Sequence, residues 1–249
     1  MSGASGITRL AAEASPADDG SLAALYATPT APWLRVNFVA SIDGAVEVGG
    51  VSAPLSSPPD QRVLRLLRMQ CDALLIGAGT LRAERYGPMA LGEPERAWRR
   101  EHGLPAHPRL VVVSGSLDLD PGQPGFAEAP VRPLVLTQET APARRRAALA
   151  ATAEVVTAGT GTVDLAEARS ALHSRGLTRI LCEGGPHLLG ALTAADLVDE
   201  LCLTISPLLA GAGAGRITAG LTSPLRTMSL RHVLAAGDTL FLRYQRANA

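Results

Sequence analysis

Lysine is absent from this 249-residue sequence, and all 23 of its basic residues are arginine. Without lysine, the chain has no residue for a Schiff base and no Walker A phosphate loop. Cysteine is scarce, and Cys71, Cys182 and Cys202 show no C-x-x-C spacing. We therefore expect buried, reduced thiols and a cytoplasmic protein, because disulfide frameworks belong to oxidising compartments.

The chain also lacks net charge, long apolar runs and metal-binding motifs. Its 23 acidic residues balance the 23 arginines, whereas nucleic acids and membrane surfaces attract a basic face. No apolar run approaches the ~20 residues that span a bilayer, and residues 1–20 lack the pattern of a secretory signal. The five histidines form no HExxH motif. We expect no nucleic acid, membrane or metal partner.

Apolar strands alternate with helical patterns along most of the chain. This alternation predicts a three-layer α/β fold: a mixed, mostly parallel sheet, helices on both faces and an antiparallel hairpin at 228–246. Residues 1–32 are expected to be a partly mobile lead-in, 33–249 a single domain, and 115–130 a surface loop. Strands are expected at 33–41, 71–80, 109–115, 131–137, 154–159, 179–183 and 199–209, and helices at 59–70, 81–87, 142–151, 163–176 and 186–197.

Two strands end in glycine-bearing turns that lead into helices. One turn carries Gly77 and Gly79, and the other carries Gly184 and Gly185 behind Glu183. Ligands of open α/β sheets bind beyond the carboxyl ends of the strands, and helix N-termini with nearby glycines attract phosphates. The pattern suggests a dinucleotide pyrophosphate site, with a tight strand–helix turn that binds no ligand as an equal alternative.

Polar residues accompany the first strand and the helices that follow it. Asn37 shares a strand face with Val39, and an asparagine inside an apolar strand must bond to backbone or face a cleft. Asp60 lies in the first turn of a helix, where it could cap the helix or hold a substrate's amino groups. Glu84 could reach a ribose hydroxyl or lie on a solvated helix face.

Three stretches together resemble a known enzyme family. They are RVNFVASIDGAVEVGGVSAPLSS (35–57), LLRMQCDALLIGAGTLRAERYG (66–87) and ILCEGGPHLLGALTAADLVDELCLTISPLLAG (180–211). They are similar to the reductase domain of the bifunctional deaminase/reductase of riboflavin biosynthesis. This is the NADPH-dependent phosphoribosylaminouracil reductase family, which has a dihydrofolate-reductase-like fold. The chain most resembles its stand-alone actinobacterial members, because no zinc deaminase domain precedes the match.

The resemblance implies a cofactor site and a substrate site at the carboxyl edge of the sheet. The implied NADPH-binding set is Val39, Ala40, Gly77, Gly79, Thr80, Glu84, Ser114, Glu183, Gly184, Gly185, Pro186, His187 and Leu188. The implied substrate-binding set is Asn37, Ser52, Ser56, Asp60, Arg68 and Glu183. Asn37 and Asp60 are the catalytic candidates. The resemblance also implies a homodimer.

The sequence departs from the family at two places. Asn37 stands where bifunctional bacterial members carry lysine, although archaeal members have asparagine there. In AERYGPMA (83–90), Arg85 and Tyr86 replace an acid and a proline, and the arginine that follows in the family is missing. This second departure bears on recognition of the substrate phosphate. Arg82 or Arg85 could meet a 2′-phosphate of the cofactor, with simple solvent exposure as the alternative.

The leading hypothesis is hydride transfer from NADPH to the open-chain imine of a ribosylaminopyrimidine, with water or the substrate itself as the proton source. A second hypothesis is a dihydrofolate-type reductase in which Asp60 holds the pterin. A third is an NADPH-binding protein without catalytic activity. The expected substrate is therefore a small pyrimidine or pterin.

Overall fold

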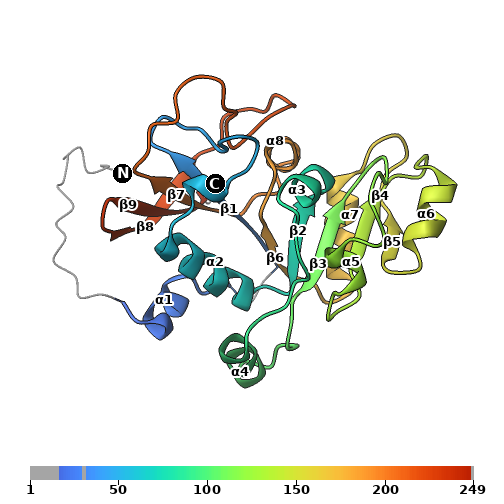
Figure 1. Cartoon of the computed structure of the whole chain (residues 1–249), viewed down its shortest axis with the longest axis horizontal. Coiled ribbons are helices and arrows are strands. Elements are labelled where there is room, and N and C mark those ends of the chain that lie inside the picture. The colour runs from blue at the N-terminus through green and yellow to red at the C-terminus, as the bar shows by residue number, and fades with distance from the viewer. Residues whose placement is uncertain (1–16, 30–31, 248–249) are drawn as a thin grey trace.

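The computed structural model describes residues 17–29 and 32–247 of the chain (Figure 1). They form a nine-stranded sheet in the order β5-β4-β3-β2-β6-β1-β7-β9-β8. The strands are β1 Trp33–Ser41, β2 Ala73–Gly77, β3 Arg109–Val113, β4 Leu134–Thr137, β5 Glu154–Thr157, β6 Arg179–Cys182, β7 Glu200–Ser206, β8 Met228–Ala236 and β9 Thr239–Arg246. The helices are α1 Asp19–Leu25, η1 Ala53–Leu55 (a 3-10 helix), α2 Pro58–Gln70, α3 Ala78–Ala83, α4 Glu93–Glu101, α5 Pro124–Ala127, α6 Ala143–Leu149, α7 Leu165–His173 and α8 Pro186–Ala194.

The sheet is parallel from β5 to β7 and becomes antiparallel at β9 and β8. The predicted mixed sheet with a C-terminal hairpin is thus confirmed. Strands β2, β3 and β4 are apolar along almost their whole length, which is typical of parallel strands with helices on both faces. In β3, for example, Leu110, Val111 and Val112 are all at most 1% exposed.

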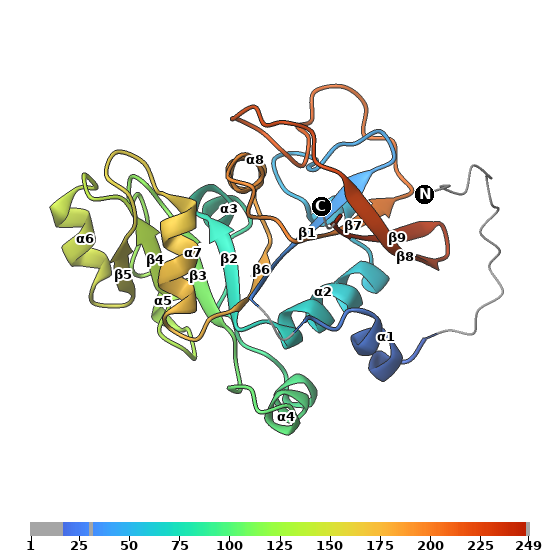
Figure 2. The ribbon, with the colours of Figure 1, turned by 180° about the vertical axis from the view of Figure 1, so that it is seen from behind.

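Each face of the sheet has its own apolar core. On one face α2, α3 and α5 pack through Leu67, Leu81 and Phe126. On the other face α7 and α8 pack through Leu172 and Leu189, and Figure 2 shows α7 lying in front of β3 and β4. No helix among the described residues combines the length and the apolarity that crossing a bilayer requires. The three-layer arrangement agrees with the prediction.

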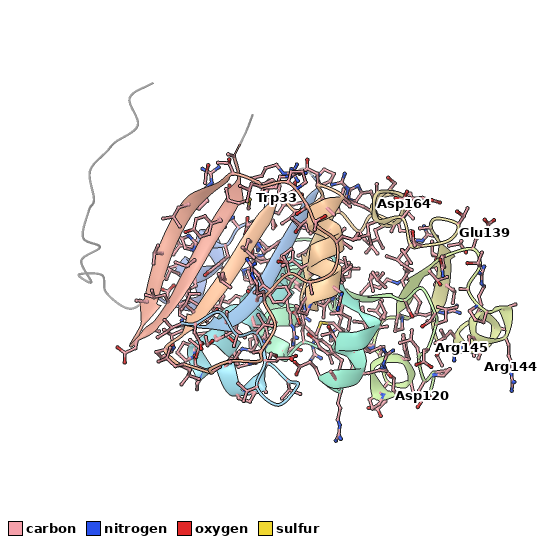
Figure 3. The ribbon with its side chains drawn as sticks, turned by 90° about the horizontal axis from the view of Figure 1, so that it is seen from above. Trp33, Asp120, Glu139, Arg144, Arg145 and Asp164 are labelled. Atoms are coloured by element: carbon pink, nitrogen blue, oxygen red, sulfur yellow. The ribbon has the colours of Figure 1, made fainter. Side chains whose placement is uncertain are left out.

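The two ends of the sheet are built differently. Seen from above in Figure 3, the antiparallel hairpin stands at one end and helix α6, with Arg144 and Arg145, stands at the other. The middle of the sheet, where β1, β6 and β2 run side by side, lies between these ends. This middle part is where the glycine-bearing turns meet.

Several predicted bounds are wrong. The strand expected over 71–80 ends at Gly77, where α3 begins at once. The strand expected from 131 begins at Leu134, because Pro133 has no N–H for a ladder. The segment 115–130, predicted to be a surface loop, contains α5 and buries Leu117 and Phe126. The glycines and prolines of this segment suggest a loop, but its isolated apolar side chains still pack into the core. Helices α1 and α4 were not expected.

A buried ionic cluster holds α1 to the sheet. This ionic clasp consists of Arg35, Glu200 and Arg243, from the neighbouring strands β1, β7 and β9. Arg35 Nη2 donates to the Tyr26 carbonyl at 2.6 Å, and Arg243 donates to the Leu25 carbonyl at the end of α1. Part of the predicted lead-in is therefore a docked helix. Residues 1–16 and 30–31, which also belong to the lead-in that was predicted to be partly mobile, lie outside the described residues.

Candidate active site

A cleft opens where β1 continues past the end of its neighbour β6. β6 pairs with β1 from Arg179↔Trp33 to Cys182↔Val36, whereas β7 stays paired with β1 as far as Ser41. Beyond Val36, the β6-facing edge of β1 has no strand partner in the described part of the chain; we call it the free edge of β1. A cavity of about 560 Å³ lies here, bordered also by α2, the β2–α3 turn and the β6–α8 turn.

Most of the predicted site residues come together in this cleft. Those that line it are Asn37, Val39, Ser52, Ser56, Asp60, Arg68, Gly77, Gly79, Thr80, Glu84, Glu183, Gly185, Pro186, His187 and Leu188. Three predicted cofactor residues do not line it. Ala40 and Gly184 neighbour lining residues, and Ser114 is buried at the end of β3, where its Oγ accepts the Leu117 N–H at 3.0 Å.

The two glycine turns are joined by a main-chain hydrogen bond and pack closely against neighbouring side chains. The Gly77 N–H donates to the Gly184 carbonyl at 2.7 Å, and the Gly184–Gly185 peptide bond is cis. A Cβ added to Gly184 would stand 2.5 Å from Phe38 Cζ, and one added to Gly185 would stand 2.7 Å from Thr80 Oγ1. At Gly184 the ring contact and a φ of +82° therefore require glycine whether or not a pyrophosphate approaches, whereas at Gly185 a Cβ would have to displace the Thr80 hydroxyl.

Arg68 and Glu183 pair with each other at the cleft wall. Arg68 Nε donates to Glu183 Oε1 at 2.7 Å and its Nη2 donates to Oε2 at 2.6 Å. The Tyr86 hydroxyl also donates to Oε2. Burial, with the adjacent Glu183 carboxylate, raises the pKa of Tyr86 well above 10.0. Burial has the largest single effect on the pKa of Arg68 and lowers it, but Glu183 and Tyr86 together outweigh burial, so that pKa rises overall. Tyr86 is therefore a neutral donor, and Arg68 keeps its charge.

Asp60 is buried between two hydroxyl groups rather than serving as the cap of α2. Its Oδ1 accepts the Thr204 hydroxyl at 2.7 Å, and its Oδ2 accepts the Ser56 hydroxyl. The N-cap of α2 is Ser57, whose Oγ accepts the Asp60 N–H at 3.4 Å. Because Asp60 also lines the cleft, its carboxylate is held at a fixed place in the wall.

Glu84 and Asn37 differ in whether their side chains hydrogen-bond to other protein groups. Glu84 Oε1 accepts the Ser52 N–H at 2.8 Å, so it ties α3 to the loop that carries Ser52 and Ser56. Asn37 is half-buried on β1, and its side-chain amide makes no hydrogen bond within the described residues. Asn37 thus presents a free donor and a free acceptor next to the cleft.

Sequence reasoning missed several cleft residues. Tyr86 stood out only as a departure from the family, and Phe38 was assigned no role. Thr204, which supports Asp60 from behind and does not itself line the cleft, carried no signal, because Asp60 lies 144 positions away in the chain. Gln61, whose Nε2 donates to Ser56 Oγ at 2.6 Å, follows Asp60 directly and gave no pattern of its own.

The sequence of this chain is similar to those of known reductases. Residues 32–242 match the family model described as the RibD C-terminal domain. The chain is 32% identical over 189 residues to the 2,5-diamino-6-ribosylamino-4(3H)-pyrimidinone 5′-phosphate reductase of Methanothermobacter thermautotrophicus, across 74% of this chain and 82% of that protein.

Solved structures add the fold. A pyrimidine reductase-like protein from Corynebacterium diphtheriae is 31% identical, with a TM-score of 0.81 over 88% of this chain and 93% of that one. The riboflavin biosynthesis reductase Rib7 of Saccharomyces cerevisiae is 17% identical, with a TM-score of 0.64 over 88% and 92% of the two chains, and supports the fold alone. The expected resemblance is confirmed: this chain belongs to the RibD C-terminal domain family.

Proposed function

We propose that this chain is an NADPH-dependent reductase acting on a ribosylaminopyrimidine phosphate in riboflavin biosynthesis. The observation that carries the proposal is the position of the cleft. Both glycine turns and the free edge of β1 open into one cavity beyond the carboxyl ends of parallel strands, where open α/β sheets bind their ligands. Two similar proteins are named as a pyrimidinone phosphate reductase and as a pyrimidine reductase-like protein.

The residues at the glycine turns fit a nicotinamide dinucleotide. Apart from its chain neighbours and the backbone of its own helix, no described atom lies within 4 Å of where a Cβ on Gly79 would stand, so a ligand can approach the main chain there. Helix α8 begins at Pro186, beside the cleft, and the positive end of its dipole favours a pyrophosphate. Bound NADPH would supply the hydride. The free edge of β1 near Val39 would hold the nicotinamide ring.

The polar residues of the cleft would orient the substrate. Asn37 is not an acid, but its free amide can hydrogen-bond sugar hydroxyls or fix a water that delivers the proton. Arg68 uses Nε and Nη2 on Glu183, and its Nη1 has no partner within the described residues. That group can donate to a carbonyl oxygen of the pyrimidine. Asp60, Ser56 and Ser52 complete the proposed substrate wall.

The test measures NADPH oxidation by the purified protein with the ribosylaminopyrimidine phosphate and, separately, with dihydrofolate. We expect faster turnover of the pyrimidine. Asn37→Ala should lower kcat by about 10- to 100-fold, because it removes one or two hydrogen bonds to the substrate or to the water. Arg144→Ala, at the far end of the sheet, is the matched control and should match wild type. If the protein binds NADPH tightly but oxidises it with neither the pyrimidine nor dihydrofolate, only the hypothesis of a binding protein without catalytic activity remains.

A dihydrofolate-type reductase is the second candidate, because Asp60 is held rigidly in the cleft wall and is not used as a helix cap. A carboxylate in such a position can accept two N–H groups from an aminopyrimidine edge. If this candidate is right, dihydrofolate is the faster substrate and Asp60→Asn abolishes its turnover. If dihydrofolate is not reduced by the wild type, the candidate is removed.

We also propose a homodimer and a cytoplasmic location. Leu209, Leu221 and Leu225 lie exposed in the segment between β7 and β8, at 78%, 68% and 102%. A second copy that covers this apolar surface would account for it. The free, buried cysteines at 71, 182 and 202 suit a reducing compartment.

A further inference from the structure

Arg85 occupies a backbone position that ordinarily belongs to glycine. Helix α3 closes with two hydrogen bonds, Tyr86 N–H to the Leu81 carbonyl at 3.3 Å and Arg85 N–H to the Arg82 carbonyl at 3.4 Å. This pair of bonds is the Schellman arrangement, in which the residue after the cap takes a left-handed conformation. Arg85 has φ +47°. Glycine would adopt this conformation without the steric cost of a Cβ.

Arg85 is an exposed residue of the cleft lining, and its side chain makes no hydrogen bond or ion pair within the described residues. The other arginine of the lining, Arg68, is neutralised by Glu183. Two of the lining carboxylates accept hydrogen bonds from neutral groups, Asp60 from Thr204 and Glu84 from Ser52, and a third, Glu47, also lines the cleft. Among the described residues that line the cleft, Arg85 is thus the arginine without an ion-pair partner, and it stands at a position where its Cβ lowers the stability of the cap.

The neighbours of Arg85 place it on the substrate side. Glu84, the preceding residue, binds the N–H of Ser52, in the loop that carries the proposed substrate residues. By contrast, Arg82 donates to the Asp118 carbonyl at 2.7 Å and does not line the cleft. Of the two arginines in this turn, Arg85 alone can reach a ligand inside the cavity.

We propose that Arg85 binds a phosphate monoester in the cleft and so supplies the cation that the family places further along the chain. This inference rests on the proposed function, because it names the residue that binds a phosphate group of the proposed substrate or of the proposed cofactor. Two sources carry the same chemistry, the 5′-phosphate of the ribosylaminopyrimidine and the 2′-phosphate of NADPH. Arg85 directly follows Glu84, which binds the N–H of the proposed substrate residue Ser52, and this position favours the substrate's phosphate.

The experiment compares wild type with Arg85→Gly, Arg85→Lys and the matched control Arg82→Ala. Each protein is assayed with phosphorylated and dephosphorylated ribosylaminopyrimidine, and with NADPH and NADH. Arg85→Gly should melt at the same temperature as wild type or higher, because glycine suits the cap. Its kcat/KM should fall about 10- to 100-fold for the phosphorylated substrate only. Arg85→Lys should recover part of this loss, and Arg82→Ala should match wild type.

A loss that separates NADPH from NADH would support the same role for Arg85 with the cofactor as the source. An Arg85→Gly protein with unchanged kcat/KM in every arm, or with equal losses in all of them, would overturn the inference. Glu47→Gln, which removes another lining carboxylate, should not lower kcat/KM for the phosphorylated substrate; a loss equal to that of Arg85→Gly would overturn the inference.

Calorimetric binding of the same four ligands separates this inference from the proposed function. If the wild type turns over no pyrimidine but binds a phosphorylated ligand more tightly than its dephosphorylated form, the proposed function fails. Loss of that preference in Arg85→Gly would then still support the role of Arg85. No preference in the wild type would overturn it.

Discussion

At the scale of single residues, the glycines of the two turns differ in how much room a Cβ would have. Some are packed against protein side chains, and one faces the space where a ligand would bind. Gly184 and Gly185 meet Phe38 and Thr80 at distances that exclude a Cβ, whereas Gly79 faces open space. The same residue type therefore has two different roles in one turn system. Substitution by alanine at each place distinguishes these roles.

Gly184→Ala should destabilise the protein by about 1–3 kcal/mol, because its Cβ meets the Phe38 ring and its φ is +82°. Gly79→Ala is the matched variant. It should leave the free energy of unfolding unchanged or raise it slightly, since alanine suits helix α3, but weaken NADPH binding. Urea unfolding and NADPH titration measure both effects. Equal stabilities of Gly184→Ala and wild type would mean that the Phe38 ring yields.

At the scale of elements, the ionic clasp joins three strands and a helix. Glu200 accepts from Arg35 Nε at 2.5 Å and from Arg243 Nη2 at 2.9 Å, and all three side chains are buried. Burial opposes ionisation of Glu200, but the two arginines outweigh it and lower the pKa of Glu200 to about 2. The charge on this carboxylate therefore stabilises the folded state.

The sign of the pH dependence follows from that lowered pKa. The stabilisation is complete above the ordinary value of 4.5 and is lost as the pH falls from there toward about 2. Glu200→Gln should destabilise the protein by about 3–5 kcal/mol near neutral pH, because two buried arginines lose their counter-charge. It should also unfold with a shallower pH dependence in that acid range. Chemical denaturation at several pH values measures both, and an unchanged slope would contradict this account.

At the scale of the whole molecule, association is the property to test. Analytical ultracentrifugation of the wild type should give the mass of a dimer. The double variant Leu209→Asp, Leu225→Asp should sediment as a monomer, because it places charge on the proposed interface. Arg144→Asp, on α6 at the far end of the sheet, is the control and should remain dimeric. A monomeric wild type would remove the homodimer from the proposal.

Much of the architecture could be predicted, because strand and helix patterns are local. The sheet, the terminal hairpin and the meeting of the glycine turns follow from apolar runs and the carboxyl-edge rule. The contacts that depend on register could not be predicted. Nothing local shows that β6 stops at Cys182 while β1 continues, or that Thr204 meets Asp60. Likewise, nothing marks Arg35 and Arg243 as the groups that dock α1.

The free edge of β1 has a consequence for inhibition. A compound that hydrogen-bonds to main-chain groups of this edge uses partners that side-chain substitutions leave in place. Only proline removes a backbone N–H, and proline within β1 would also endanger its pairing with β7. Resistance to such a compound would therefore have to arise at the rim of the cleft, at positions such as Arg85 and Tyr86.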